Sequence, residues 1–324
     1  MKSPWIESLR SVALTVPDLA AAETFYTQVW RLIVAARRPG VLYLRGSGHD
    51  HHLLALHQRP GLPQILKVTL RARDAAALHA IAAATAQAGG VVEQAVATAS
   101  PESDPAGGHS VILRDVHGRR YEVVHGDCRR AADELGAQGG TPHGPQERTQ
   151  GASNHALHDR PQRLAHAVLN SHDVPAAQGF LEAALGFVLA DRTRIMAFMN
   201  CDRDHHSIAI GDTDNDALNH IAFVMPTLDA VMRGGGRMQD AGHAIEWGPG
   251  RHGPGANAFN YFIDPFGIVI EYTAEVEQID DRYRPRGPSE WTWPPGRVDQ
   301  WGISAAPSAR LKVAQRAVLF STTL

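Results

Sequence analysis

The sequence has few cysteines, no excess of basic residues and no long apolar run. Cys128 and Cys201 are the only cysteines in 324 residues, too few for a disulfide framework. The formal net charge of -3 and the pI near 6.6 provide no basic footprint for nucleic acid and no polybasic membrane anchor. No run of about 18 apolar residues occurs, and residues 1–9 lack the apolar core of a secretory signal. We therefore expect a soluble, cytoplasmic protein that acts on small molecules.

The length and an internal repeat indicate a duplicated chain. A chain of 324 residues, 44% of them hydrophobic, is long enough for two domains with real cores. Four pairs of segments match between the two copies. They are residues 9–25 with 164–180, Asp50-His51-His52 with Asp204-His205-His206, Arg73-Asp74-Ala75 with Leu228-Asp229-Ala230, and Asp115-Val116-His117-Gly118 with Asp264-Pro265-Phe266-Gly267.

Each copy is predicted to contain two βαβββ modules. In the first copy, apolar runs of strand type and amphipathic runs of helix type alternate in this order. Strands are expected at residues 12–16, 41–44, 52–56, 65–70, near 91, 110–113 and 121–124, and helices at residues 19–30 and 75–88. Asp18 and Asp74 are suited to cap the helices, and Gly89-Gly90 is a typical helix stop.

A linker and a tail complete the predicted organisation. Residues 127–162 are rich in Gly, Pro, Gln, Arg and His and lack periodicity, which is typical of a linker, with a short helix expected at residues 130–135. We expect solvated loop histidines at positions that include His143, His155 and His158. The predicted domains are therefore residues 1–126 and 163–280, followed by a tail at residues 281–324.

Three tryptophans, Trp291, Trp293 and Trp301, lie among prolines in this tail. Such residues seldom stay solvated together. We expect them to pack on the C-terminal domain near the mouth of a pocket, or at a subunit interface. An amphipathic stretch at residues 310–320 has no readable role.

Residues 257–272 predict a strand, a tight turn and a second strand. Asp264-Pro265 and Gly267 suit the turn. Because side chains alternate along a strand, Ile268 and Ile270 face one way and Glu271 the other. A carboxylate in so apolar a strand must lie at an exposed edge, be paired, or bind a cation. For an isolated glutamate, an exposed sheet edge would be the favoured alternative.

Two histidines earlier in the sequence favour cation binding by Glu271. His166 and His220 lie in the first strands of the two modules of the second copy. A single histidine in an apolar strand is usually structural. Three residues of ligand type at corresponding places in repeated modules, however, indicate a site formed by His166, His220 and Glu271. Two neutral imidazoles and one carboxylate leave open coordination positions, as in non-haem Fe(II) oxygenases.

The first copy differs at the matching positions, where it has Ser11, Lys67 and Glu122. A lysine beside Glu122 would neutralise the carboxylate and repel a divalent cation. We therefore expect one metal site per chain and an N-terminal domain without metal ligands.

With these residues the sequence resembles the type I extradiol catechol dioxygenases of the vicinal oxygen chelate (glyoxalase/bleomycin resistance/dioxygenase) superfamily, which include 2,3-dihydroxybiphenyl dioxygenase and catechol 2,3-dioxygenase. The resemblance covers about residues 8–280. It implies an α+β fold of two tandem vicinal oxygen chelate domains, whose curved mixed sheets surround a cavity. It also implies that His206 is the acid/base residue, that His252 contacts substrate from a loop, and that Tyr261 hydrogen-bonds an oxygen held at the metal.

Two positions fit the resemblance less well. His205 is a weaker match than His206, because two adjacent side chains of a strand cannot both point into one pocket. Gly255 stands where some members of the family have an acidic residue that assists the loop histidine.

The resemblance implies ring cleavage in aromatic catabolism. A catechol and O₂ would meet at Fe(II), or at Mn(II), which shares its ligand preferences. Both oxygen atoms would enter a muconic semialdehyde-type product. We expect these two small molecules as partners, no nucleic acid or membrane partner, and a homo-oligomer.

The same fold hosts other functions, which remain alternatives. They are glyoxalase-like isomerases, thiol transferases of the fosfomycin-resistance kind, and non-catalytic binders of the bleomycin-resistance type. A glyoxalase-type site generally adds a second carboxylate ligand. A binder would have no need of three ligands together with His206, His252 and Tyr261.

Overall fold

The computed structural model describes residues 3–100, 104–131 and 159–322. Residues 132–135 of the helix expected at residues 130–135, as well as His143, His155 and His158, lie outside these ranges. Within them, no helix is both long enough and apolar enough to span a membrane.

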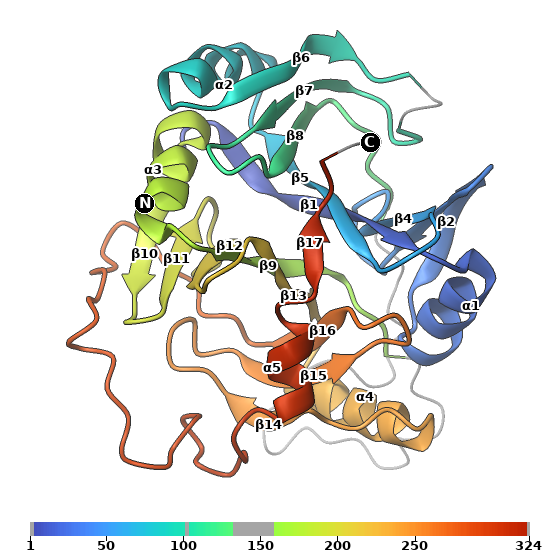
Figure 1. Cartoon of the computed structure of the whole chain (residues 1–324), viewed down its shortest axis with the longest axis vertical. Helices are drawn as coiled ribbons and strands as arrows, with labels where there is room; N and C mark the ends of the chain where they lie inside the picture. Colours follow the sequence, from blue (N-terminus) through green and yellow to red (C-terminus); the bar gives the residue numbers. More distant parts are fainter. Residues whose placement is uncertain (1–2, 101–103, 132–158, 323–324) are drawn as a thin grey trace.

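The predicted βαβββ pattern is confirmed and occurs four times (Figure 1). The first module contains β1 (Ile6–Val16), α1 (Leu19–Thr24), a π-helical turn η1 (Phe25–Val29), β2 (Ile33–Arg38), β3 (Val41–Arg45) and β4 (Leu54–Gln58). The second contains β5 (Gln64–Ala72), α2 (Ala75–Gln87), β6 (Val91–Thr98), β7 (His109–Arg114) and β8 (Arg120–His125). The third contains β9 (Arg163–Ser171), α3 (Val174–Leu185), β10 (Val188–Arg192), β11 (Met196–Asn200) and β12 (Ile208–Asp212). The fourth contains β13 (Ala217–Val224), α4 (Leu228–Asp240), β14 (Trp247–Arg251), β15 (Ala258–Ile263) and β16 (Val269–Ala274).

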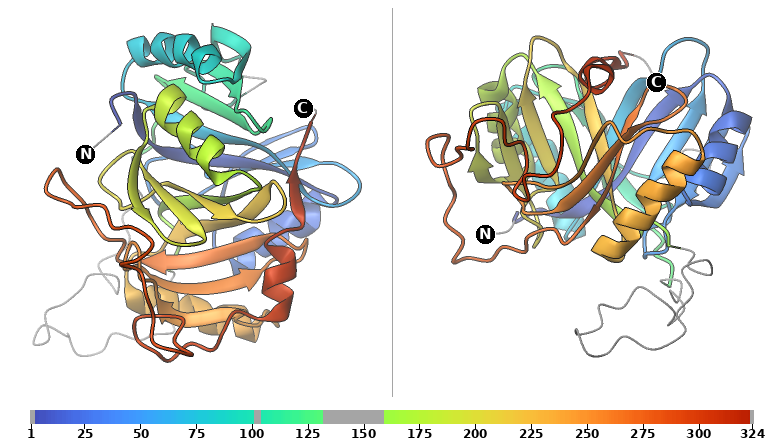
Figure 2. Two further views of the ribbon diagram at one scale, coloured as in Figure 1. Left: turned by 60° about the vertical axis from the view of Figure 1, so that its left-hand side comes forward. Right: turned by 90° about the horizontal axis from the view of Figure 1, so that it is seen from below.

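Strand pairing joins the modules. In each half the first strands of the two modules pair antiparallel, β1 with β5 and β9 with β13. Each first strand also pairs in parallel with the last strand of its own module. After a short helix α5 (Ala309–Ala314), strand β17 (Val318–Phe320) pairs with both β13 and β5, so the paired strands of the described ranges form one continuous sheet (Figure 2).

The helix ends follow local hydrogen-bonding rules. Asp18 and Asp74 accept amide hydrogen bonds at the starts of α1 and α2, as predicted. Thr227, and not Asp229, caps α4, so the counterpart of Asp74 lies two residues earlier than the sequence match suggested. Helix α1 also ends earlier than expected, because the chain widens into the π-helical turn that precedes Trp30.

The two halves share one apolar core. The Trp30 ring stacks on Tyr272, with centroids 3.6 Å apart, and so joins the first module to the fourth. On the other side α2 lies beside α3, and Tyr121 packs against Phe180 (Figure 1). The buried cluster draws on strands of all four modules. This shared core fixes the position of the C-terminal sheet, which carries the candidate site.

The turn between β15 and β16 is held by Asp264. Its Oδ1 accepts hydrogen bonds from the amides of Phe266 and Ile268, and its Oδ2 accepts one from the Tyr26 hydroxyl of the other half at 2.8 Å. Gly267 has φ +91°, which explains the glycine at this position. Burial raises the pKa of Asp264 to about 6, although the hydrogen bonds oppose this effect.

We expect Asp264→Asn to change how stability depends on pH. The native carboxyl keeps its proton up to about pH 6, whereas the ordinary pKa is 3.8, so wild-type stability contains a contribution that is lost as pH rises between these values. The asparagine imitates the protonated form. The variant should gain on the order of 3 kcal/mol over wild type between pH 4 and pH 7. Urea unfolding at each pH measures this difference, and a gap that stays constant with pH would contradict it.

Candidate metal centre

Three neighbouring strands bring His166, His220 and Glu271 together. The residue opposite His166 on β13 is Ala222, and Ala222 pairs with Glu271 on β16. His220 lies two residues before Ala222, so its side chain points to the same face. All three ligand residues are buried.

The three ligand atoms are evenly spaced. His166 Nε2 and His220 Nε2 lie 3.3 and 3.2 Å from Glu271 Oε2, and 3.3 Å from each other. Adjacent ligands of an ion with bonds of about 2.1 Å at right angles are separated by about 3 Å. The spacing therefore suits one face of a metal ion.

The hydrogen-bond network fixes the tautomer of His220. Its Nδ1 lies 2.8 Å from Asn219 Oδ1, and Asn219 donates its amide hydrogen to Asn170 Oδ1. Asn170 in turn donates to the Gln315 carbonyl. Since Asn219 Oδ1 is an acceptor, His220 carries its hydrogen on Nδ1 and directs a bare Nε2 at the carboxylate. Two acceptors then face each other at 3.2 Å, an arrangement that a cation would stabilise.

The ionisation states agree with a cation site. Burial lowers the pKa of His220 to about 4, so the imidazole is neutral at pH 7. Burial alone would raise the pKa of Glu271, but its contacts with His166, His220 and His252 hold the pKa well below the usual value. Asn257 donates to the other oxygen of Glu271 at 3.3 Å. The site offers the bare nitrogen of neutral His220 and one negative oxygen beside the Nε2 atom of His166.

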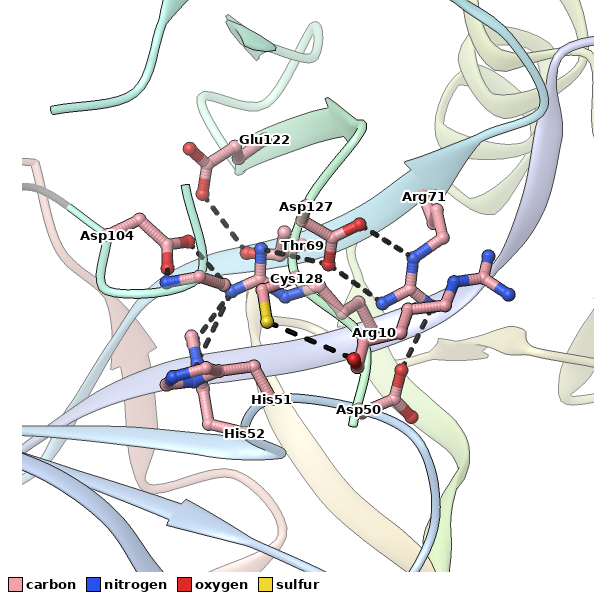
Figure 3. A network of polar contacts seen from close by, with 12 residues as sticks. Arg10, Asp50, His51, His52, Thr69, Arg71, Asp104, Glu122, Asp127 and Cys128 are labelled. Atoms are coloured by element: carbon pink, nitrogen blue, oxygen red, sulfur yellow. Dashed lines mark hydrogen bonds and ion pairs between the residues drawn. The ribbon is translucent and has the colours of Figure 1, made fainter. Parts of the chain in front are cut away.

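In the N-terminal half, the place that corresponds to the metal centre is occupied by a lysine ammonium. Lys67 Nζ lies 2.6 Å from Glu122 Oε2, so the predicted pairing of lysine with carboxylate is confirmed. The counterpart of His206 is His52, whose Nε2 lies 2.8 Å from the Arg10 guanidinium (Figure 3). Because arginine only donates, this nitrogen is already engaged. Arg10 also pairs with Asp104.

One further group of potential ligands occurs in the described part of the chain, formed by His117, His172 and Asp216. The His172 side chain is 54% exposed, and Asp216 is paired with Arg119, whose charge repels a cation. This group is a weaker candidate than the buried one.

The other predicted site residues surround the three ligands. The His206 ring lies 4.4 Å from the His166 ring, centroid to centroid. The Tyr261 hydroxyl lies 3.3 Å from His220 Nε2 and 3.0 Å from His252 Nε2. Gly255 has φ +80°, and its missing side chain leaves room for the His206 ring. All six predicted residues therefore meet in one place.

Comparison with known proteins agrees with this geometry. Residues 163–272 match the model of the Glyoxalase/Bleomycin resistance protein/Dioxygenase superfamily. The match lies within the C-terminal half. Metapyrocatechase 2 of Cupriavidus necator is 33% identical over 151 residues, which cover 44% of this chain and 45% of that protein. The metapyrocatechase of Pseudomonas sp. (strain CF600) is 29% identical over 115 residues, or 33% of this chain and 38% of that protein. The chain thus matches less than half the length of either curated relative.

Solved structures share the fold over nearly the whole chain. The Mn(II)-bound glyoxalase from Novosphingobium aromaticivorans is 29% identical, with a TM-score of 0.81 and 94% of each chain covered. Homoprotocatechuate 2,3-dioxygenase from Arthrobacter globiformis is 21% identical, with a TM-score of 0.78 and coverage of 99% of this chain and 95% of that one. The expected α+β fold of tandem vicinal oxygen chelate modules is confirmed.

Behind His206, the C-terminal half contains a series of hydrogen bonds that the sequence did not reveal. His205 points away from the site, and its Nε2 lies 3.0 Å from Asp191 Oδ2. Its Nδ1 lies 3.1 Å from His206 Nδ1. Tyr283 of the tail also donates to Asp191, at 2.8 Å. The only sequence signal was an aspartate inside an apolar strand, residues 188–192.

These hydrogen bonds fix the positions of the hydrogens on His205 and His206. Burial alone would raise the pKa of Asp191, but hydrogen bonds from His205, the Arg286 amide and Tyr283 keep it below its usual value. Since Asp191 is an acceptor, His205 carries its hydrogen on Nε2 and accepts at Nδ1. His206 must then donate from Nδ1, which leaves its Nε2 bare.

The tail packs on the loop that carries His252, so the expected packing on the C-terminal domain is confirmed. Gln300 donates to the His252 carbonyl. The Arg251 guanidinium lies 5.0 Å from the centre of the Trp301 ring. A Cβ atom added to Gly253 would lie only 2.5 Å from the Trp293 ring, so this glycine permits the close contact.

We expect protein purified without oxygen to hold about one Fe(II) or Mn(II) per chain. His220→Ala should abolish binding, because it removes a ligand. Asn219→Ala should weaken affinity by roughly 10- to 100-fold, since it releases the orientation of His220. Elemental analysis and competition with a chelator measure these effects. His172→Ala is the matched control and should keep its metal. Two ions per chain, or full metal in His220→Ala, would contradict the assignment.

Proposed function

We propose that the protein is an extradiol dioxygenase that opens a catechol-type aromatic beside its two hydroxyls. The observation that carries the proposal is the three-ligand face of His166, His220 and Glu271, with His206 and the Tyr261–His252 pair next to it. Similarity to metapyrocatechases and to a homoprotocatechuate 2,3-dioxygenase supports this substrate class. The product would be of the muconic semialdehyde type, and it would retain both atoms of O₂.

The ligand set suits Fe(II), with Mn(II) as the alternative. A divalent metal held there would supply an electrophilic centre at which the catechol oxygens and O₂ meet and exchange electrons. Because an imidazole binds a metal in its neutral form, the single Glu271 carboxylate would leave such an ion with one net positive charge, which attracts the ionised diol. The proposal places the chemistry in residues 163–280 and assigns residues 1–126 no metal chemistry. We also propose that the protein is cytoplasmic and forms a homo-oligomer.

His206 is placed to move the proton. Burial lowers the pKa of His206 well below its usual value, so the ring is neutral at pH 7. Its Nδ1 hydrogen is committed to His205, and the bare Nε2 can accept a proton from a substrate hydroxyl and return it later. A positioned acid/base residue contributes about 10²- to 10⁴-fold in rate.

Tyr261 and His252 supply preorganised polar contacts. Burial raises the pKa of Tyr261 well above its usual value, so the hydroxyl keeps its proton and can donate to a developing oxyanion. His252 is stacked on Phe259 with centroids 4.0 Å apart, which fixes the direction of its ring. These contacts need little rearrangement during the reaction.

We expect His206→Gln and His166→Gln to fail in different ways. His206→Gln should keep its metal and bind catechol almost normally, while turnover falls by roughly two to four orders of magnitude. His166→Gln should lose the metal and therefore all activity. Oxygen uptake with a catechol panel, together with metal analysis, separates the two cases. An unchanged rate in fully metal-loaded His206→Gln would disprove proton transfer by His206 and, because His205 points away from the site, leave His252 as the candidate.

We expect His205→Leu to lower kcat by roughly 10- to 100-fold with metal content and KM unchanged, because His206 loses the acceptor that sets its tautomer. His205→Gln offers an amide oxygen and should recover part of the rate. A purely structural role would instead lower metal content or stability in both variants. Equal rates in wild type and His205→Leu would disprove the positioning role.

A second candidate is a metal-dependent glyoxalase-type isomerase, favoured by the similarity to the Mn(II)-bound glyoxalase. Such a site generally adds a second carboxylate ligand. In the described residues, the buried ligand group contains one carboxylate, that of Glu271. Isomerisation of a thiol–ketoaldehyde adduct without oxygen uptake would identify this activity.

A further inference from the structure

The N-terminal half contains a cavity at the place that corresponds to the metal centre. Its volume is about 500 Å³, within the range of about 300–1,000 Å³ that is usual for small-molecule sites. Ser11, Lys67 and Glu122 line it, and strand pairing makes these three the counterparts of His166, His220 and Glu271.

Lys67 gives the cavity an ammonium group with N–H donors that can still receive an acceptor. An ammonium group has three N–H donors, and in the described part of the chain the only hydrogen bond of Lys67 is to Glu122. The Lys67 side chain is 19% exposed, so it is accessible from the cavity. Where the C-terminal half would hold a metal, the N-terminal half presents an ammonium that can still receive an oxygen ligand.

One side of the cavity is apolar and corresponds to an apolar cluster of the C-terminal half. Ala13, Tyr43, Ala55 and Leu66 form a separate apolar cluster on this face. Strand register equates the first three with Val168, Phe198 and Ala209, which form the corresponding cluster in the C-terminal half. Tyr43 pairs with Ala55 and Ala55 with Ala13, so an aromatic ring lies beside two small side chains and forms an apolar surface that suits an aromatic ligand.

The carboxylates that line the cavity are paired with cations. Arg10 neutralises Asp104, and Lys67 neutralises Glu122 (Figure 3 shows Arg10, Asp104 and Glu122). His57, another lining residue, is neutral, because burial, Lys67 and Arg59 lower its pKa to about 4. Lys67 is therefore the cation of the cavity lining that an anionic oxygen can reach.

We propose that this cavity is a second ligand site, which binds a small aromatic molecule through one ionised oxygen, a phenolate or a carboxylate, placed on Lys67. No chemistry follows at this site, because it has no open metal position and Arg10 occupies the base nitrogen of His52. The inference does not depend on the proposed function of the other half.

The test is a titration of the full-length, metal-loaded protein with 4-nitrophenol, whose absorbance reports its ionised form. Wild type and the metal-free His220→Ala variant should both bind and ionise the probe, because the substitution of His220 does not touch this cavity. Lys67→Met should bind at least about tenfold more weakly, which is the loss expected for a charge-assisted hydrogen bond. Benzoate should displace the probe if the cavity accepts carboxylates, and should fail to do so if it selects phenolates.

Two further variants guard against misfolding. Lys67→Met leaves Glu122 buried without its partner, so the double variant Lys67→Met/Glu122→Gln removes both charges. Ala55→Phe keeps the Lys67–Glu122 ion pair and fills the cavity space beside Ala55, so it too should abolish binding. Circular dichroism and bound metal per chain verify the fold. Binding that survives Ala55→Phe, that is lost in His220→Ala but kept in Lys67→Met, or that is absent from wild type would overturn the proposal.

Discussion

A buried carboxylate between two imidazoles is the constraint on which the rest of the site depends. Glu271 is fully buried and held as an anion, and the nearest nitrogen of His220 turns a lone pair toward it. A charge in such surroundings is costly unless something compensates it. The N-terminal half meets the same requirement with Lys67. Each half therefore contains a buried glutamate at one position and satisfies it in a different way.

Duplication makes this contrast possible. Because both halves use the same βαβββ arrangement, the residue that faces the glutamate sits at the same register position in each. A histidine there leaves room for an exchangeable ion, whereas a lysine makes the cation part of the chain. Arg10 adds a second difference, since it engages the nitrogen that remains bare on His206. Ser11 and Lys67 in place of His166 and His220, together with Arg10, thus separate a candidate catalytic half from one suited only to binding.

The sequence predicted the fold and the three ligand residues because those signals are local or repeated, whereas His206, His252 and Tyr261 followed from the family resemblance. His166, His220 and Glu271 are polar residues in apolar strands at corresponding module positions, and the turn around Asp264 has a clear composition. Asp191 and Asn170 could not be found in this way. Their partners are His205 and Asn219, and the contacts arise only when distant segments pair. The π-helical turn before Trp30 was also missed, because its wider hydrogen bond has no simple sequence pattern.

Strand β17 has a consequence for the order of assembly. It closes the gap between β5 and β13, and the Gln315 carbonyl just before it receives the amide of Asn170, which leads through Asn219 to His220. All sixteen other strands of the described chain are synthesised before β17. A chain synthesised as far as β16 can therefore form both duplicated sheets, yet it lacks the last support of the His220 ring. Tight capture of an ion must wait for the segment that contains Gln315 and β17.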